Sequence, residues 1–178
     1  MKALTASLLL LLTLFPPTGM SLSGAAGPHE IFILKVNDAI GPGVADFIKT
    51  GIEKANDDLA ACMIIELDTP GGLAESMRVI VKAILASKVP IVVFVSPSGA
   101  RAASAGVMIT MAADIAAMAP GTNIGAAHPV GAGGQEINKT MSDKVVNDMV
   151  AHARSVAEQR GRNACLLYTS PSPRDQRP

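Results

Sequence analysis

The sequence has no tryptophan, and aromatic residues make up only 3% of its 178 positions. Proteins that bind single-stranded nucleic acid stack the bases on aromatic side chains, and such a platform is missing here. Basic and acidic residues both number 15, which gives a formal net charge of zero. A chain without excess positive charge also lacks the electrostatic signature of a nucleic-acid-binding protein. We therefore expect no nucleic acid among its partners.

Cysteine is scarce as well, and the two residues present, Cys62 and Cys165, form neither a CxxC pair nor a disulfide framework. A structural zinc site needs a cluster of cysteine and histidine ligands, and the sequence contains no such cluster. We therefore expect no metal ion and no other cofactor. Cys62 lies in an apolar run, which predicts a buried side chain that behaves as a small hydrophobe.

What the chain has in quantity is small and aliphatic residues. Hydrophobic residues make up 49% of the sequence and charged residues 17%, which is enough for a packed core and argues against disorder. The length fits one domain of ordinary size. The aliphatic composition is typical of a closely packed α/β core.

The N-terminus has the pattern of a secretory signal peptide. Lys2 precedes an apolar stretch from Leu8 to Phe15, two prolines follow, and small residues lead to Ala25 and Ala26. The apolar stretch is short for a membrane span, which favours cleavage over an uncleaved anchor. We assign residues 1–26 to this peptide and expect the remainder to be exported, to a periplasm or the outer face of a membrane.

The C-terminus departs in composition from the helix before it. Residues 165–178, "CLLYTSPSPRDQRP", resemble the translation of a transposon-type sequencing adapter. We therefore predict a non-native tail, rather than a genuine proline-rich one, and exclude it from the fold. The expected domain is then residues 30–164, and its native C-terminal continuation is missing.

Between these ends, short apolar runs alternate with segments of helical periodicity. Runs of this kind are typical of strands that are buried on both faces, in a parallel sheet covered by helices. The fold class is therefore α/β, and ligands are expected at the carboxyl ends of the strands. We predict strands at 31–36, 62–69, 90–96 and 115–119, and helices at 41–61, 73–87, 104–113 and 142–163.

Two predicted strand ends carry unusual residues: "DTPGG" at 68–72 and "SPSGARAASAGVMI" at 96–109. Ser104 opens a helix, so it is either an N-cap or a nucleophile whose developing oxyanion faces free N–H groups. Gly71 and Gly72 either supply a positive φ in a turn or offer N–H groups to the same oxyanion. Ser96 and Ser98 fit turns better than catalysis.

A serine nucleophile needs a base. Lys144 and His128 are the main candidates, with Lys139 beside them. Lys144 falls in the first turn of the last predicted helix, where it is either a solvated surface lysine or, if buried, a usable base. His128, in a loop of small residues, could serve as base, substrate contact or structural hydrogen-bonding group. His29 borders the signal peptide and His152 falls on the exposed side of the helix, so both fit less well.

The motifs "DTPGG", "SAG", "NIGAAHPV" and "RGRN", in this order and spacing, resemble those of the membrane-associated serine proteases of the NfeD family. The resemblance covers about residues 30–164. It implies a Clp-protease/crotonase-like fold built from repeated β-β-α units.

The resemblance also implies the chemistry of the site. Ser104 falls at the nucleophile position and Lys144 at the general-base position, so the family's Ser–Lys dyad is expected here. Gly71 or Gly72 would provide one oxyanion donor and Ala105 the other. In the related soluble Clp proteases the base is a histidine, which keeps His128 as an alternative base or substrate contact. The likeness to the lysine-using branch favours Lys144.

The implied substrates are hydrophobic segments of membrane-associated proteins, notably the C-terminal region of stomatin-like partners. The family associates as dimers or larger oligomers, and its long members continue into transmembrane helices and a small β-barrel domain. We expect this chain to reach the membrane through that missing part.

Two other functions fit the same residues. A crotonase-type acyl-CoA enzyme would use a similar pair of N–H donors, but an exported protein does not meet cytosolic CoA substrates. A non-catalytic scaffold for a membrane protein would use Ser104 only as an N-cap.

Overall fold

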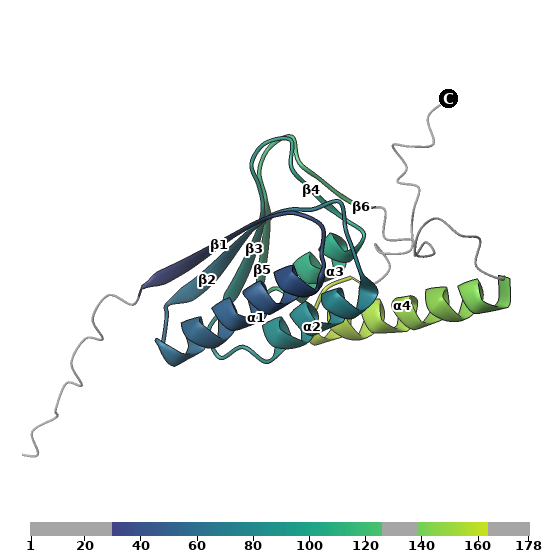
Figure 1. The fold of residues 1–178 in the computed structure, drawn as a ribbon, viewed down its shortest axis with the longest axis horizontal. Helices are drawn as coiled ribbons and strands as arrows, with labels where there is room; N and C mark the ends of the chain where they lie inside the picture. Colours follow the sequence, from purple (N-terminus) through teal and green to yellow (C-terminus); the bar gives the residue numbers. More distant parts are fainter. Residues whose placement is uncertain (1–29, 126–138, 164–178) are drawn as a thin grey trace, which may run out of the picture.

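A computed structural model describes residues 30–125 and 139–163 (Figure 1). The four strands and four helices expected from the periodicity are all present, with shifted ends, and two short strands are added. The elements are β1 (Ile31–Asn37), α1 (Pro42–Asp57), β2 (Cys62–Asp68), α2 (Ala74–Leu85), β3 (Ile91–Val95), β4 (Arg101–Ala103), α3 (Ala105–Ala112), β5 (Ile115–Met118), β6 (Asn123–Gly125) and α4 (Lys139–Gln159).

The main sheet has four parallel strands in the order β1-β2-β3-β5. Each crossover between neighbouring strands contains a helix, which is how parallel strands are connected. The carboxyl ends of β2 and β3 therefore lie at the same edge, with Leu67 opposite Val95. This arrangement confirms the predicted α/β class and brings the two unusual strand ends to one side of the molecule.

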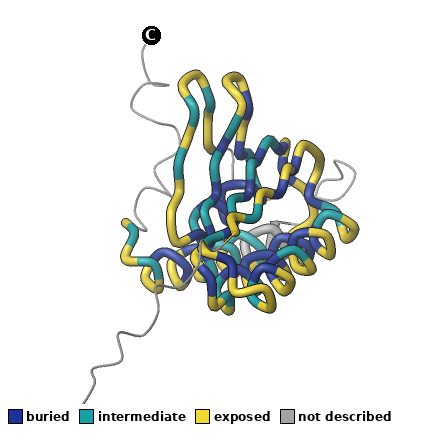
Figure 2. The backbone as a smooth tube through the Cα atoms, turned by 90° about the vertical axis from the view of Figure 1, so that its left-hand side faces the viewer, coloured by how far each residue is buried: buried dark blue, intermediate teal, exposed yellow. Residues whose placement is uncertain are grey.

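The core lies between the sheet and the helices, where Figure 2 shows most of the buried backbone. Burial alternates along β2 and β3, so one face of each strand points to the helices. A Cβ added to Gly51 of α1 would come within 2.9 Å of Leu34 and 3.2 Å of Met63, so α1 lies directly on the sheet.

The opposite face of the sheet differs from the prediction. In the described part of the chain the helices cover one face, so Ile31, Ile33 and Ile115 stay 57%, 56% and 56% exposed. Cys62 lies on this same face and is half-buried, so its predicted place in the core was wrong. The sequence predicted strands buried on both faces because many residues of this second face are aliphatic as well.

The small-residue stretch after β3 folds back over the sheet edge and forms a second, two-stranded parallel sheet of β4 and β6. An isolated bridge between Thr69 and Ala102 joins it to the end of β2. These strands have three residues each and were missed, since so few small residues give no local strand signal.

Helix α4 packs against α3, and an ion pair between Asp148 and Arg78 links it to α2; its N-terminal turns extend past α2 in Figure 1. It begins three residues earlier and ends four residues earlier than predicted. On the side of α4 that faces the protein, Ala153, Val156 and Ala157 are buried.

The arginines of the "RGRN" motif attach the end of α4 to α3. Arg160 Nε donates to the carbonyl of Ala112 over 2.7 Å and its guanidinium pairs with Asp114, while Arg162 donates to the carbonyl of Thr110 over 2.9 Å. These carbonyls belong to the last turn of α3, which has no intrahelical donors for them. The motif therefore caps α3, the helix that Ser104 opens.

Several expectations fall outside the described residues. The signal peptide at 1–26, the tail at 165–178 and the side chains of His29 and His128 belong to this group, so these assignments stay predictions. Within the described ranges, no helix is long and apolar enough to cross a membrane.

Candidate functional site

Ser104 follows β4 directly and precedes the first residue of α3. It adopts φ 51° and ψ −110°, an uncommon conformation for a residue with a side chain. Its hydroxyl makes no capping hydrogen bond to α3, although the residue occupies the N-cap position. A non-glycine residue held in such a conformation is typical of functional sites, where the surrounding structure imposes it. The geometry therefore favours the nucleophile interpretation over the capping one.

The surrounding backbone explains how this conformation is held. The Ser104 N–H donates to the Gly125 carbonyl over 3.0 Å, and the Ala103 N–H donates to the Thr69 carbonyl over 3.1 Å. The Thr69 N–H in turn donates to the Arg101 carbonyl over 2.7 Å. Ser104 is thus fixed from both sides, by β6 and by the segment that follows β2.

The "DTPGG" segment and Ser104 are in direct contact, as the strand-end argument predicted. Gly71 is buried and has φ +108°, and a Cβ placed there would lie 2.7 Å from the Ser104 Cβ and 3.2 Å from its Oγ. Only glycine allows both this backbone conformation and this closeness. Gly71 is therefore required by the position of the serine.

The two glycines differ in what their N–H groups do. The Gly71 N–H donates to the Thr69 Oγ1 over 3.1 Å, and this oxygen belongs to a fully buried side chain. The N–H groups of Gly72 and Ala105 have no acceptor among the described residues. Ala105 is the first residue of α3, where the helix N–H groups lack intrahelical partners. Gly72 and Ala105 are therefore the donors that remain available to a bound carbonyl oxygen.

Thr69 is a member of this site that the sequence analysis did not single out. Its hydroxyl accepts from the Gly71 N–H and lies 3.3 Å from the Gly71 carbonyl, while its methyl group faces Gly106. A threonine two residues before a glycine turn is the available signal, because its hydroxyl can bond to backbone ahead of it. Thr69 thereby fixes the turn that approaches Ser104.

Lys144 lies in the second turn of α4 rather than the first, because the helix begins at Lys139. Its side chain is exposed, and it makes no hydrogen bond or ion pair with any residue that the structure describes. The structure therefore does not bring Lys144 into contact with Ser104. His128 lies outside the described ranges.

His152 was predicted to lie on the exposed side of α4, and this was wrong. The residue is half-buried against α2, and its Nε2 atom is buried with no hydrogen-bond partner among the residues that the structure describes. Burial lowers the pKa of His152 below its ordinary value, and the positive charge of Arg78 lowers it further, while Asp148 acts in the opposite direction. The error has a physical cause: α4 packs on α2 as well as on α3, so its buried face is wider than the apolar stripe.

The close contact between Gly71 and Ser104 can be tested by substitution of the glycine. We expect Gly71→Ala to lower the rate of Ser104 acylation by at least ~10-fold and the free energy of unfolding by about 1–3 kcal/mol, since both a positive φ and a clash must be accommodated. Gly99 is the matched control, because it has φ +91° with no atom within 4 Å of an added Cβ. Urea denaturation and labelling by a serine-directed phosphonate measure the two effects. Equal effects in Gly71→Ala and Gly99→Ala would contradict a role for the contact.

Among the described residues, no group of three or more histidine, cysteine, aspartate or glutamate side chains is arranged to hold a metal ion.

This chain is similar in sequence to proteins of a known family. The family model "NfeD1b, N-terminal domain" matches residues 30–170. The membrane-bound protease PH1510 of Pyrococcus horikoshii is 39% identical over 139 residues, which cover 76% of this chain and 31% of that protein. This chain thus spans about a third of the length of that curated relative.

The fold of this chain is also similar to solved structures of other proteins. A serine-to-alanine mutant of the 1510-N membrane-bound stomatin-specific protease has a TM-score of 0.72 and 36% identity, covering 80% of this chain and 69% of that one. A lysine-to-alanine mutant of the same protease, in complex with a substrate peptide, has the same TM-score and identity and covers 80% and 65%. ClpP1 from Listeria monocytogenes, with a TM-score of 0.58 and 20% identity over 76% of this chain and 75% of that one, shares the fold.

Proposed function

This chain belongs to the family of NfeD1b N-terminal domains, and we propose that it is a serine endopeptidase with a Ser–Lys dyad. The observation that carries the proposal is the uncapped, left-handed Ser104 at the start of α3, in contact with the glycine turn after β2. Similarity to a protease whose serine and lysine mutants have been solved supports it.

The proposed first step is acylation of Ser104. Lys144, in its neutral form, accepts the hydroxyl proton while the Oγ atom attacks the scissile carbonyl. The negative charge then develops on the carbonyl oxygen, and the N–H groups of Gly72 and Ala105 stabilise it at the N-terminus of α3. Collapse of the tetrahedral intermediate breaks the C–N bond, and the Lys144 ammonium returns the proton to the leaving amine. The neutral Lys144 amine then deprotonates a water molecule, which attacks the acyl-enzyme and releases Ser104.

This mechanism requires the Lys144 amine to approach the Ser104 Oγ to about 3 Å. The two residues make no contact in the structure, so the catalytic state needs α4 or a bound substrate to bring them together. Catalytic hydrogen bonds in unliganded enzymes are often longer than in the Michaelis complex. His128 is the alternative base or substrate contact.

We further propose that the substrates are hydrophobic segments of membrane-associated proteins, with a stomatin-like protein as the natural partner. The similar 1510-N protein is described as a stomatin-specific membrane-bound protease, and this supports the proposal. The N-terminal signal pattern supports the proposal that the reaction takes place at the extracytoplasmic face of the membrane. We also propose that the protein forms a homodimer or larger assembly and attaches to the membrane through a C-terminal continuation.

Cleavage assays with paired peptides test the substrate class. We expect the protein to cleave a 20-residue peptide made of aliphatic residues at least ~10-fold faster, in kcat/KM, than a matched peptide with every third residue replaced by glutamate. The peptides are kept in the same detergent, and products are identified by mass spectrometry. Binding of the apolar peptide without cleavage would favour the alternative function, a non-catalytic scaffold for a membrane protein.

A further inference from the structure

Three ionisable residues follow one another at intervals of four on α4: Lys144, Asp148 and His152. Residues four apart lie on the same side of a helix, one turn above another, with their Cβ atoms about 5–6 Å apart. The Asp148 carboxylate is therefore within reach of the Lys144 ammonium on one side and of the His152 ring on the other. Despite this spacing, Lys144 has no ion pair among the described residues.

The Asp148 carboxylate is instead occupied by an arginine from another helix. Arg78 of α2 forms an ion pair and a hydrogen bond with Asp148 through its Nη2 atom. The Arg78 side chain is 30% exposed and that of Asp148 67% exposed. Helices α2 and α4 run in the same direction here, since Arg160, farther along α4, reaches the Ile84 carbonyl of α2 over 3.5 Å. The turn that carries Lys144 thus lies toward the end of α2 that follows Gly72.

The choice of partner matters chemically. A carboxylate beside an ammonium group stabilises its charged form, and a charged lysine cannot accept a proton. An arginine guanidinium binds a carboxylate with a planar fork of donors, remains charged throughout the accessible pH range, and so is a stronger competitor for it than a lysine.

We propose that Arg78 keeps Lys144 available as the general base by occupying the carboxylate of Asp148. This inference rests on the proposed Ser–Lys mechanism and assigns Arg78 and Asp148 as positioning residues, since neither touches the reacting atoms.

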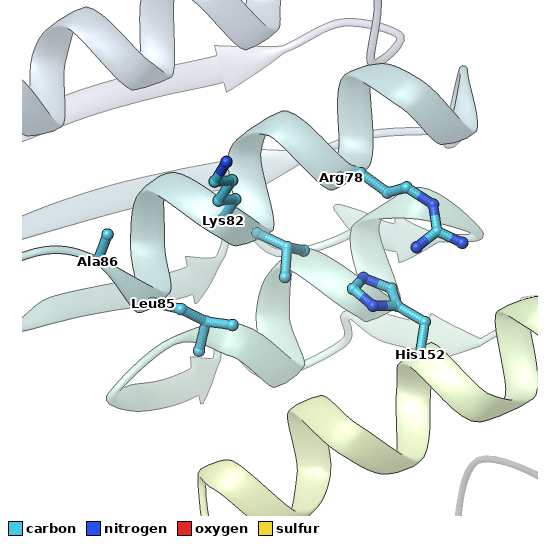
Figure 3. A pocket seen from close by; sticks show the side chains of 6 residues that line it. Arg78, Lys82, Leu85, Ala86 and His152 are labelled. Atoms are coloured by element: carbon cyan, nitrogen blue, oxygen red, sulfur yellow. The ribbon is translucent and has the colours of Figure 1, made fainter.

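The other groups around this cluster do not take over the role of Arg78. Burial and the charge of Arg78 lower the pKa of His152, which favours its neutral form and weakens it as an ionic competitor for Asp148. Lys82 lines the same pocket of about 470 Å³ between α2 and α4, where Figure 3 shows the His152 ring pointing from α4 toward α2. Glu75, in the first turn of α2, is exposed and forms no ion pair with a described residue. Helix α3 carries no ionisable side chain.

The test is the pH dependence of kcat for cleavage of the apolar peptide, measured on the full chain. In Arg78→Met, Asp148 is free to pair with Lys144, so we expect the acidic limb of the profile to move up by about half a pH unit, or roughly a threefold loss of activity on that limb. Arg78→Met/Asp148→Asn removes the competing carboxylate as well, and its limb should return to the wild-type position. Asp148→Asn alone should not move the limb upward.

Lys82→Met is the matched control, because it removes a cation from the same helix and the same pocket without releasing a carboxylate. An unshifted limb in Arg78→Met would overturn the proposal, and so would a loss of kcat that is equal at all pH values and persists in the double variant, since that pattern indicates a structural role. Either result leaves the Ser–Lys mechanism standing provided that Ser104→Ala and Lys144→Ala are inactive. Activity in Ser104→Ala would instead reject the mechanism itself.

Discussion

Ser104→Ala is expected to abolish labelling by a serine-directed phosphonate and to lower kcat for peptide cleavage by at least ~10³-fold. The substitution removes the only atom that the proposed mechanism uses to form the acyl-enzyme. It should leave the fold intact, because the Ser104 hydroxyl caps no helix and the adjoining backbone hydrogen bonds do not involve it. The free energy of unfolding should change by less than about 0.5 kcal/mol. Mass spectrometry of the labelled wild-type protein should locate the adduct on Ser104.

Two nearby serines provide the controls for this experiment. Ser96 is half-buried at the end of β3, and the Ser98 hydroxyl donates to the Pro120 carbonyl over 2.7 Å. Both belong to the same small-residue stretch, so Ser96→Ala and Ser98→Ala should keep their labelling. Full labelling of Ser104→Ala would exclude this residue as the nucleophile and return it to the role of a helix-opening residue.

Much of the main sheet was predictable because its strands are short aliphatic runs bounded by turn residues. β1, β2 and β3 fall within one or two residues of their predicted bounds, and their parallel order follows from the helices between them. From this topology alone, the ends of β2 and β3 had to meet at one edge. That is why the contact between Gly71 and Ser104 could be anticipated from residues far apart in the sequence.

The details of the site depend on contacts that no local pattern encodes. The pairing of β4 with β6 joins residues about twenty positions apart, and the small side chains there give no periodicity. The Thr69 hydroxyl decides which of two adjacent glycines keeps a free N–H, and this depends on the turn geometry. The ion pair between Arg78 and Asp148 joins residues on different helices, 70 positions apart. Sequence periodicity identifies the helices but not the register in which they pack.

The identity of the base carries the second large effect. Lys144→Ala should lower kcat by ~10³-fold or more if the lysine is the only proton acceptor, because the efficiency of a serine nucleophile depends on the base beside it. Lys144→Arg should be about as inactive, since arginine keeps the positive charge and the hydrogen-bond donors but does not lose its proton. His128→Ala should stay within about tenfold of the wild type. The same phosphonate labelling and peptide cleavage assays measure all three variants.

Lys144→Arg is the decisive variant, because it separates proton transfer by residue 144 from electrostatic attraction of the substrate. If Lys144 only positioned the peptide, arginine would replace it well and activity would return.

The pH profile of the wild type adds an independent criterion. A histidine with its ordinary pKa of about 6.5 is already neutral at pH 8, so a histidine base predicts a plateau there. A lysine accepts a proton only when neutral, so kcat should still rise above pH 8. A plateau below pH 8, together with an inactive His128→Ala and an active Lys144→Ala, would identify His128 as the base instead.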